Sequence, residues 1–247
     1  MSYFIFDGVL KSGKEFQLGN QEARHILKSR RLRIGERFLI QDLTGKRFDA
    51  VLIRCSRSKL TFVPEFSVEV PLPSALNLEI LQAITKEKAI NWILQKSTEL
   101  GVNRLDFFFG KYSTTYFNNL KRISQLDRWN RIVLESSKQC GRQFPPEIFF
   151  HEDLQMAIKT IPKCQYSWLL SPGISQSASW KNLYEGENLK KHHRILVGPE
   201  GGFHGDEIDL ALSSGMIPIY LGSRILRSET AAITAISILQ FLYGDLN

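Results

Sequence analysis

Residues 194–212 read "RILVGPEGGFHGDEIDLAL", in which an apolar strand runs into a glycine-rich loop and then into a helix that begins near Asp206. The loop Gly198–Gly202 contains two adjacent glycines, which let the backbone approach a ligand closely or take positive φ. Loops at the carboxyl ends of strands are where α/β sheets bind ligands. The stretch therefore predicts a strand–loop–helix unit of an α/β domain, whose loop is either a binding loop or only a tight connection.

A second loop of the same kind lies in "LGSRILRSETAAITA", residues 221–235. The strand "IPIYLG" ends at Gly222, and Ser228 is the best N-cap candidate for the helix that follows. This helix is almost free of charge, so we expect it to be buried against the sheet or in a subunit interface. Arg227 precedes it, where the helix dipole disfavours a cation by about 0.3–1 kcal/mol. Two such loops after late strands predict one shared pocket.

The rest of the chain divides at the proline-bearing linker 71–73. Before it, strand-like segments surround one short helix, expected at 21–29, and predict a small β-rich barrel over residues 1–70. After it, residues 74–247 alternate between strand and helix, which predicts a parallel sheet covered on both faces. We expect strands at 78–84, 104–109, 166–171, 194–198 and 217–222, and helices at 86–101 and 119–141.

The formal net charge is +7, and residues 1–70 hold most of it, with 13 basic against 8 acidic side chains. A basic domain favours a polyanionic partner, above all nucleic acid. The densest cluster, "KSRRLRIGER" at 28–37, is either an RNA contact or a solvated charged turn. The RNA-binding candidates in and before it are Arg24, His25, Lys28, Arg30, Arg31 and Arg33.

Several classes of protein are disfavoured. No apolar run reaches the roughly 18–20 residues of a membrane span, so we expect no membrane partner. The three cysteines are far apart and form no CxxC pair, which predicts neither a disulfide nor a metal site and indicates a reducing, cytoplasmic setting. The motifs GxGxxG, GxSxG and HExxH are absent, which disfavours Rossmann-type cofactor sites, serine hydrolases and zinc proteases. Apart from His25 in the basic cluster, the only scattered histidine that is a candidate for a functional role is His204, in the glycine-rich loop.

Together, "LVGPEGGF" (196–203) and "LGSRILRSETAA" (221–232) resemble the bacterial small-subunit ribosomal RNA uridine-N3 methyltransferases of the SPOUT superfamily. Three further segments resemble the same family. They are "KEKAINWILQKSTELGV" (86–102), "RWNRIVLESSKQCGR" (128–142) and "HILKSRRLRIGERF" (25–38).

The resemblance implies a PUA-like β-barrel at 1–70, followed at 74–247 by a SPOUT α/β domain with a parallel sheet and a trefoil knot. It implies an S-adenosylmethionine-dependent enzyme that methylates N3 of a specific uridine in 16S rRNA of the small ribosomal subunit, working as a homodimer without a metal. The implied cofactor-binding residues are Leu170, Ser171, Val197, Gly198, Pro199, Glu200, Gly201, Gly202, Leu221, Gly222, Ile225, Leu226, Thr230 and Ala232.

For catalysis we single out Arg227, Glu229 and Glu200. The rigid guanidinium of Arg227 could stabilise charge that develops on the uracil carbonyl oxygens, or it could hold the flanking phosphate. Alternatively, it forms an ion pair with Glu229 that only fixes the loop. Glu200 could orient a neighbour or accept the proton.

Two alternative functions remain at this point. One is a SPOUT methyltransferase that acts on another rRNA base or on tRNA. The other is an RNA-binding assembly factor that has kept the fold and lost catalysis.

Overall fold

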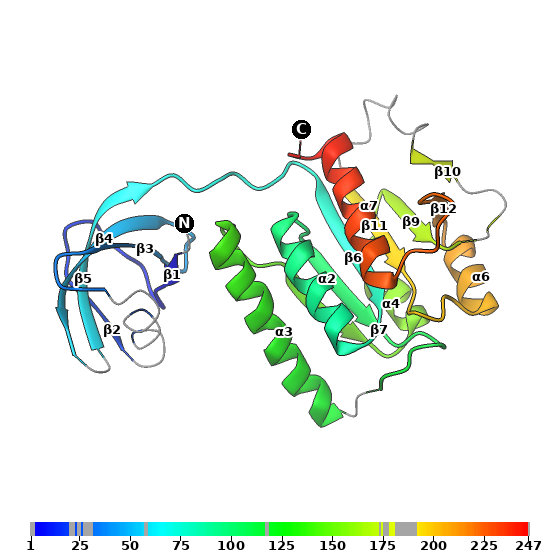
Figure 1. The fold of residues 1–247 in the computed structure, drawn as a ribbon, viewed down its shortest axis with the longest axis horizontal. Coiled ribbons are helices and arrows are strands. Elements are labelled where there is room, and N and C mark those ends of the chain that lie inside the picture. Colours follow the sequence, from blue (N-terminus) through cyan, green and yellow to red (C-terminus); the bar gives the residue numbers. More distant parts are fainter. Residues whose placement is uncertain are drawn as a thin grey trace. The chain divides into compact units, whose positions relative to one another are not determined.

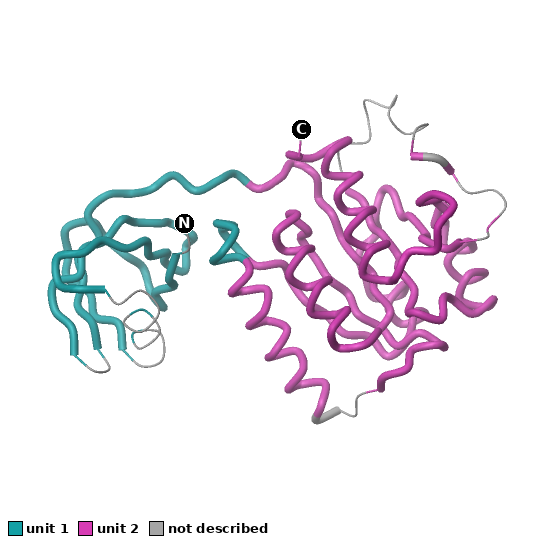
Figure 2. The backbone as a smooth tube through the Cα atoms, viewed as in Figure 1, with its two compact units in different colours: residues 1–72, 137–144 teal, residues 73–136, 145–247 magenta. Residues whose placement is uncertain are grey.

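The computed structural model describes residues 3–19, 23, 26, 32–56, 59–116, 119–172, 174, 178–180 and 192–246. The chain forms two compact units (Figure 2). Unit 1 comprises residues 1–72 and 137–144, and unit 2 comprises residues 73–136 and 145–247. No helix within the described ranges combines the length and the apolar character that a membrane span requires.

Unit 1 is built on a five-stranded sheet in the order β1-β3-β4-β5-β2. Register shifts between β4 and β5, at Asp49/Ala50 and Leu52/Arg54, curl the sheet around a core rich in phenylalanine. The predicted β-rich N-terminal domain is therefore confirmed. Most of the helix expected at 21–29 lies outside the described residues. The strands are β1 (Phe4–Ile5), β2 (Phe16–Gly19), β3 (Arg37–Gln41), β4 (Arg47–Cys55) and β5 (Lys59–Val68).

Residues 137–144 join unit 1 through the buried side chain of Arg47. Its guanidinium lies 3.8 Å from the ring centre of Tyr3 and donates hydrogen bonds to Gln41 Oε1 and to the carbonyl oxygen of Gly141. The Nε2 of Gln41 donates to the carbonyl oxygen of Gln143 at 2.7 Å. These contacts draw a segment from far along the chain into the N-terminal unit.

Unit 2 contains a seven-stranded parallel sheet in the order β10-β12-β9-β11-β6-β7-β8 (Figure 1). The strand order reverses beside β6, because β7 follows on one side while β11 and β9 lie on the other. Such a reversal opens a crevice at the carboxyl ends of the strands. The strands are β6 (Asn77–Ala83), β7 (Arg104–Phe108), β8 (Glu147–His151), β9 (Tyr166–Leu170), β10 (Ala178–Ser179), β11 (His192–Val197) and β12 (Ile217–Tyr220).

Helices cover both faces of this sheet, as the alternating pattern predicted (Figure 1). Neighbouring residues of one strand point to opposite faces, so Ile80 packs in the core beneath α2, α3 and α7, whereas Leu81 packs in the core beneath α4 and α6. The helices are α2 (Glu87–Glu99), α3 (Asn119–Cys140), α4 (Leu154–Thr160), α6 (Gly205–Ser213) and α7 (Ser228–Tyr243).

The start of α7 differs from the prediction. Its N-cap is Arg227, with φ −63° and ψ 153°, and Ser228 is already the first helical residue. Ser228 does not cap the helix because its hydroxyl donates to the carbonyl oxygen of Gly198 in the neighbouring loop. The trefoil knot stays a prediction, since residues 181–191, between β10 and β11, lie outside the described part of the chain.

Candidate active site

The glycine-rich loop after β11 is shaped by close packing. A Cβ on Gly198 would lie 3.1 Å from the ring of Phe203, and one on Gly201 would lie 3.0 Å from Cβ of Tyr112. Gly202 has φ +74°, and its amide donates to the carbonyl oxygen of Pro199 at 3.0 Å. The glycines are therefore required by the turn itself, whatever it binds.

The helix after this loop begins with a capping box. His204 Nδ1 accepts from the amide of Asp206, and Glu207 Oε2 accepts from the amide of His204. Glu207 Oε1 also accepts from the amide of Lys111, which fixes the neighbouring loop after β7. The Lys111 ammonium pairs with Asp206, which lowers the pKa of that carboxyl. The candidate histidine of the glycine-rich loop is therefore a helix cap.

The two loops meet, as predicted, and Ser228 joins them. Its hydroxyl donates to the carbonyl oxygen of Gly198 at 2.6 Å and accepts from Nε2 of Gln82 at 3.0 Å. Gln82 lies near the end of β6, and Ser228 is buried, with 6% of its surface exposed. One hydroxyl therefore ties together the carboxyl ends of β6 and β11 and the N-terminus of α7.

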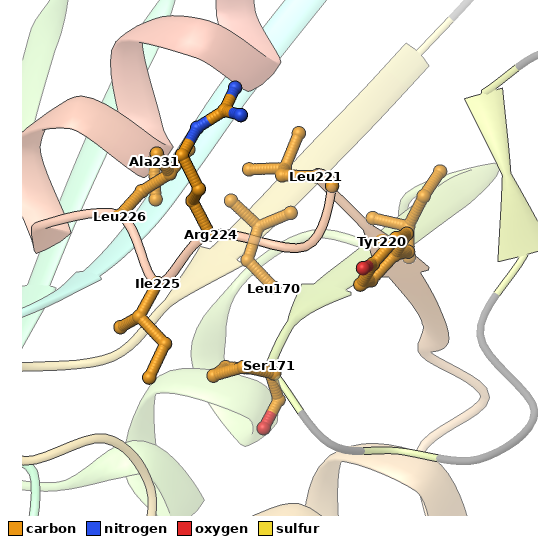
Figure 3. A pocket seen from close by; sticks show the side chains of 11 residues that line it. Leu170, Ser171, Tyr220, Leu221, Arg224, Ile225, Leu226 and Ala231 are labelled. Carbon is orange, nitrogen blue, oxygen red and sulfur yellow. The ribbon is translucent and has the colours of Figure 1, made fainter.

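A first hollow, the loop pocket, lies beside the second loop (Figure 3). Six predicted cofactor residues line it: Leu170, Ser171, Leu221, Gly222, Ile225 and Leu226. Five further residues of its wall were not predicted: Pro172, Ile219, Tyr220, Arg224 and Ala231. Each of these lies within two residues of a predicted one in the sequence, so proximity was the available signal. The wall is largely apolar, and Arg224 is its one charged residue among the described ones.

A second hollow, the helix cleft, lies between α2, the glycine-rich loop and α7. The three predicted catalytic residues Arg227, Glu229 and Glu200 line it together with Thr230. The cleft also has lining residues that the sequence did not single out: four belong to α2 and its N-cap, more than a hundred residues away along the chain, and two belong to α7. These are Lys86, Lys88, Ala89, Trp92, Ile233 and Thr234.

Within the helix cleft, Glu200 Oε1 accepts a hydrogen bond from the amide of Lys86 at 3.1 Å, so Glu200 orients the entrance of α2. The described side chains show no ion pair between Arg227 and Glu229. Arg227 is exposed at the positive end of α7, where the dipole raises the local potential further. The site can therefore receive an anionic or charge-accumulating group.

The remaining predicted cofactor residues lie outside the walls of both hollows. Val197, Gly198 and Pro199 are buried at the end of β11, and Gly201 and Gly202 complete the turn. Ala232 lies in the core of unit 2 with 0% of its surface exposed.

The basic cluster of unit 1 is only partly described. Arg33 is exposed, and its amide donates to Glu36 Oε2 at 2.9 Å. Arg24, His25, Lys28, Arg30 and Arg31 lie outside the described residues. No group of three His, Cys, Asp or Glu side chains that could hold a metal ion occurs where the structure describes the chain.

Comparison with known proteins gives a consistent result. Residues 72–240 match the family described as RNA methyltransferase domain, and residues 18–65 match the RNA methyltransferase PUA domain. A relative named ribosomal RNA small subunit methyltransferase E, from Buchnera aphidicola subsp. Schizaphis graminum, is 37% identical over 71% of this chain and 70% of its own length. A relative of the same name from Buchnera aphidicola subsp. Acyrthosiphon pisum is 29% identical over 94% and 90% of the two chains.

The solved structures agree. A ribosomal RNA small subunit methyltransferase E from Neisseria gonorrhoeae, bound to S-adenosyl methionine, is 27% identical, with a TM-score of 0.87 over 100% of both chains. A Legionella pneumophila protein described as a methyltransferase, in complex with SAM, is 28% identical, with a TM-score of 0.88 over 99% and 98% of the two chains. The family match over residues 72–240 agrees with the predicted fold and with the loops that Ser228 joins. The chain therefore belongs to the RNA methyltransferase family that includes the ribosomal RNA small subunit methyltransferases E.

Proposed function

We propose that this protein transfers a methyl group from S-adenosylmethionine to N3 of a specific uridine in 16S rRNA of the small ribosomal subunit. The observation that carries the proposal is the hydroxyl of Ser228, which joins the two signature loops. One hollow beside these loops has a largely apolar wall, and the other is lined by several charged side chains. A cofactor and a nucleotide need two such sites that lie side by side. The relatives named ribosomal RNA small subunit methyltransferase E support the class of substrate.

The loop pocket fits the cofactor by its chemistry. Leu170, Leu221 and Leu226 offer apolar surface for an adenine ring, and Ser171 offers a hydroxyl. Gly222, with φ +98°, shapes a turn that a larger residue would strain. When bound, S-adenosylmethionine supplies an electrophilic methyl group. The residues of the pocket hold and orient that group toward the substrate.

The helix cleft would receive the uridine. N3 of uridine carries a proton whose pKa lies well above neutrality, so the site must help to remove the proton or stabilise negative charge on O2 and O4. Arg227 is suited to the second task, because it is exposed in the cleft and adds its charge to that of the α7 N-terminus. Glu229, which lines the same cleft, is a candidate for orienting Arg227. The carboxylate of Glu200 has one oxygen hydrogen-bonded to the Lys86 amide, and its second oxygen is available as a proton acceptor in this proposal.

The N-terminal unit would hold the RNA through its basic cluster, with Arg33 and the neighbouring Arg30 and Arg31 as phosphate contacts. The target base would leave its stack to reach the cleft. We further propose a cytoplasmic homodimer, in line with the resemblance of the sequence to its family.

The decisive experiment incubates the purified protein with methyl-labelled cofactor and undermethylated small ribosomal subunits, and then maps the modified base. Labelling of N3 of one 16S uridine supports the proposal. Labelling of another rRNA base or of tRNA would assign a different substrate. Cofactor binding by calorimetry without any methyl transfer would favour an assembly factor that has lost catalysis.

A further inference from the structure

Two arginines three residues apart line different hollows. Arg227 lines the helix cleft, whereas Arg224 lines the loop pocket. Figure 3 shows the Arg224 side chain rising from the loop on the side of Leu221 and Ala231. Arg224 is exposed, and the described residues offer it neither an ion pair nor a side-chain hydrogen bond. Its five N–H donors are therefore available to a ligand.

An arginine in this pocket is unexpected from the charge of the proposed cofactor. S-adenosylmethionine carries a sulfonium, an ammonium and a single carboxylate, so its net charge is +1 near neutrality. A guanidinium repels the first two groups, and the described wall of the pocket contains no acidic side chain that would offset the repulsion. Of the three charged groups of the cofactor, only the carboxylate attracts Arg224.

We propose that Arg224 binds the α-carboxylate of the methionine part of the cofactor. This inference rests on the proposed function. The planar fork of the guanidinium matches a carboxylate with two parallel hydrogen bonds. Leu221 and Leu226, which flank it in the loop, provide apolar surface for the uncharged adenine end. Arg224 therefore determines which way round the cofactor enters, and it selects ligands that keep their amino-acid carboxylate.

The charges of the cofactor also explain why Arg224 and Arg227 have different tasks. The sulfonium must face the nucleophile, so the cation that acts on the uracil has to lie in the other hollow, at Arg227. Arg224 is then a cofactor-binding residue with no contact to the reacting atoms. Its loss should raise the Kd for the cofactor far more than it lowers turnover at saturating cofactor.

The test compares two ligands that differ only in the carboxylate: S-adenosylmethionine and decarboxylated S-adenosylmethionine. Calorimetry measures the affinity of both for the full-length wild-type protein and for Arg224→Ala, Arg224→Lys and the control Arg131→Ala. Arg131 is an exposed arginine on α3 that lines neither hollow. Thermal unfolding without ligand confirms that each variant is folded.

We expect the wild type to prefer S-adenosylmethionine by roughly tenfold to a hundredfold, the usual range for a charged hydrogen-bonded pair. In Arg224→Ala this preference should disappear, and the decarboxylated ligand, with its net charge of +2, should bind as well as before or more tightly. Arg224→Lys should keep part of the preference, and Arg131→Ala all of it.

An equal loss of affinity for both ligands in Arg224→Ala would overturn the proposal, since the residue would then only shape the loop. Unchanged affinity for both ligands with weakened RNA binding would also overturn it and would assign Arg224 to a phosphate. If Arg224→Ala does not fold, Arg224→Lys and the ligand preference of the wild type decide the question. Failure of the wild type to bind either ligand would contradict the proposed function instead, so the two failures are distinguishable.

Discussion

The hydroxyl of Ser228 joins the two loops, and its removal in Ser228→Ala should lower both the stability of unit 2 and the affinity for the cofactor. The variant loses the hydrogen bond to the Gly198 carbonyl and the one from Gln82 Nε2. Both partners keep other contacts, because Gln82 Nε2 also donates to the carbonyl oxygens of Ala83 at 2.9 Å and of Gly198 at 3.4 Å. Neither of these two groups is left without a partner, so the loss in free energy of unfolding should be about 1–2 kcal/mol, below the upper end for buried hydrogen bonds.

Urea unfolding followed by tryptophan fluorescence measures the free energy of unfolding of unit 2, which contains Ser228. All four tryptophans lie in unit 2, at positions 92, 129, 168 and 180, so the signal does not report on the N-terminal sheet. Cofactor affinity should also fall, because the loop 221–227 loses its anchor to the end of β11.

Ser237→Ala is the matched control on the same helix. Its hydroxyl donates only to the carbonyl oxygen of Ile233, one turn earlier, and it is partly exposed. That bond competes with the helix ladder, so its removal should change the unfolding free energy by less than about 0.5 kcal/mol. Equal urea midpoints for Ser228→Ala and Ser237→Ala would refute the reasoning that Ser228 joins the loops.

Three further predictions concern other parts of the molecule. Arg227→Ala should lower turnover at saturating cofactor by roughly a hundredfold to a thousandfold while leaving cofactor affinity within about twofold; unchanged turnover in a methyl-transfer assay would remove its role. Asp106→Asn should cost about 3 kcal/mol in urea unfolding at pH 7, because the buried carboxylate holds Arg104 and His151. Burial raises the pKa of Asp106, but the hydrogen bonds from His151 and Arg104 outweigh this effect, so the pKa is lowered overall. The loss in free energy of unfolding should therefore shrink as the pH falls below about 3.9. A loss that does not depend on pH would contradict this prediction. Charge reversal at Arg33 should weaken RNA binding and reduce the slope of log affinity against log salt by about 1 for each phosphate that the side chain no longer neutralises, and an unchanged slope would exclude a role in phosphate binding.

Much of unit 2 was predictable because its signals are local and periodic. Short apolar strands indicated β7, β9, β11 and β12. Gly101 indicated the end of α2, which stops at Glu99, and this glycine has a φ of +80°. The meeting of the two loops was predictable from topology, since the carboxyl ends of parallel strands share one edge of the sheet.

Other features depend on contacts between distant residues and leave no local signal. Segment 137–144 joins unit 1 because a buried arginine, Arg47, finds carbonyl oxygens there, and nothing near either position indicates the pairing. Trp92 and Lys86 line the helix cleft only because α2 packs against α7. Ser228 has a side chain typical of an N-cap, but its hydroxyl is hydrogen-bonded to the Gly198 carbonyl, and the N-cap is Arg227, one residue earlier.

The placement of Arg227 follows from that shift. With Ser228 held between Gly198 and Gln82, the residue before it must stand at the N-cap and point away from the buried joint, into the helix cleft. A cation at the positive end of α7 costs about 0.3–1 kcal/mol in the ligand-free protein, and no described carboxylate pairs with it to offset that cost. The cost disappears only when negative charge arrives in the cleft, so under the proposed function the arrangement would favour the charged transition state over the resting enzyme. Arg227→Ala should therefore leave the ligand-free protein as stable as the wild type or slightly more stable while it loses turnover. If Arg227 had only a structural role, Arg227→Ala would also lower the stability of the ligand-free protein.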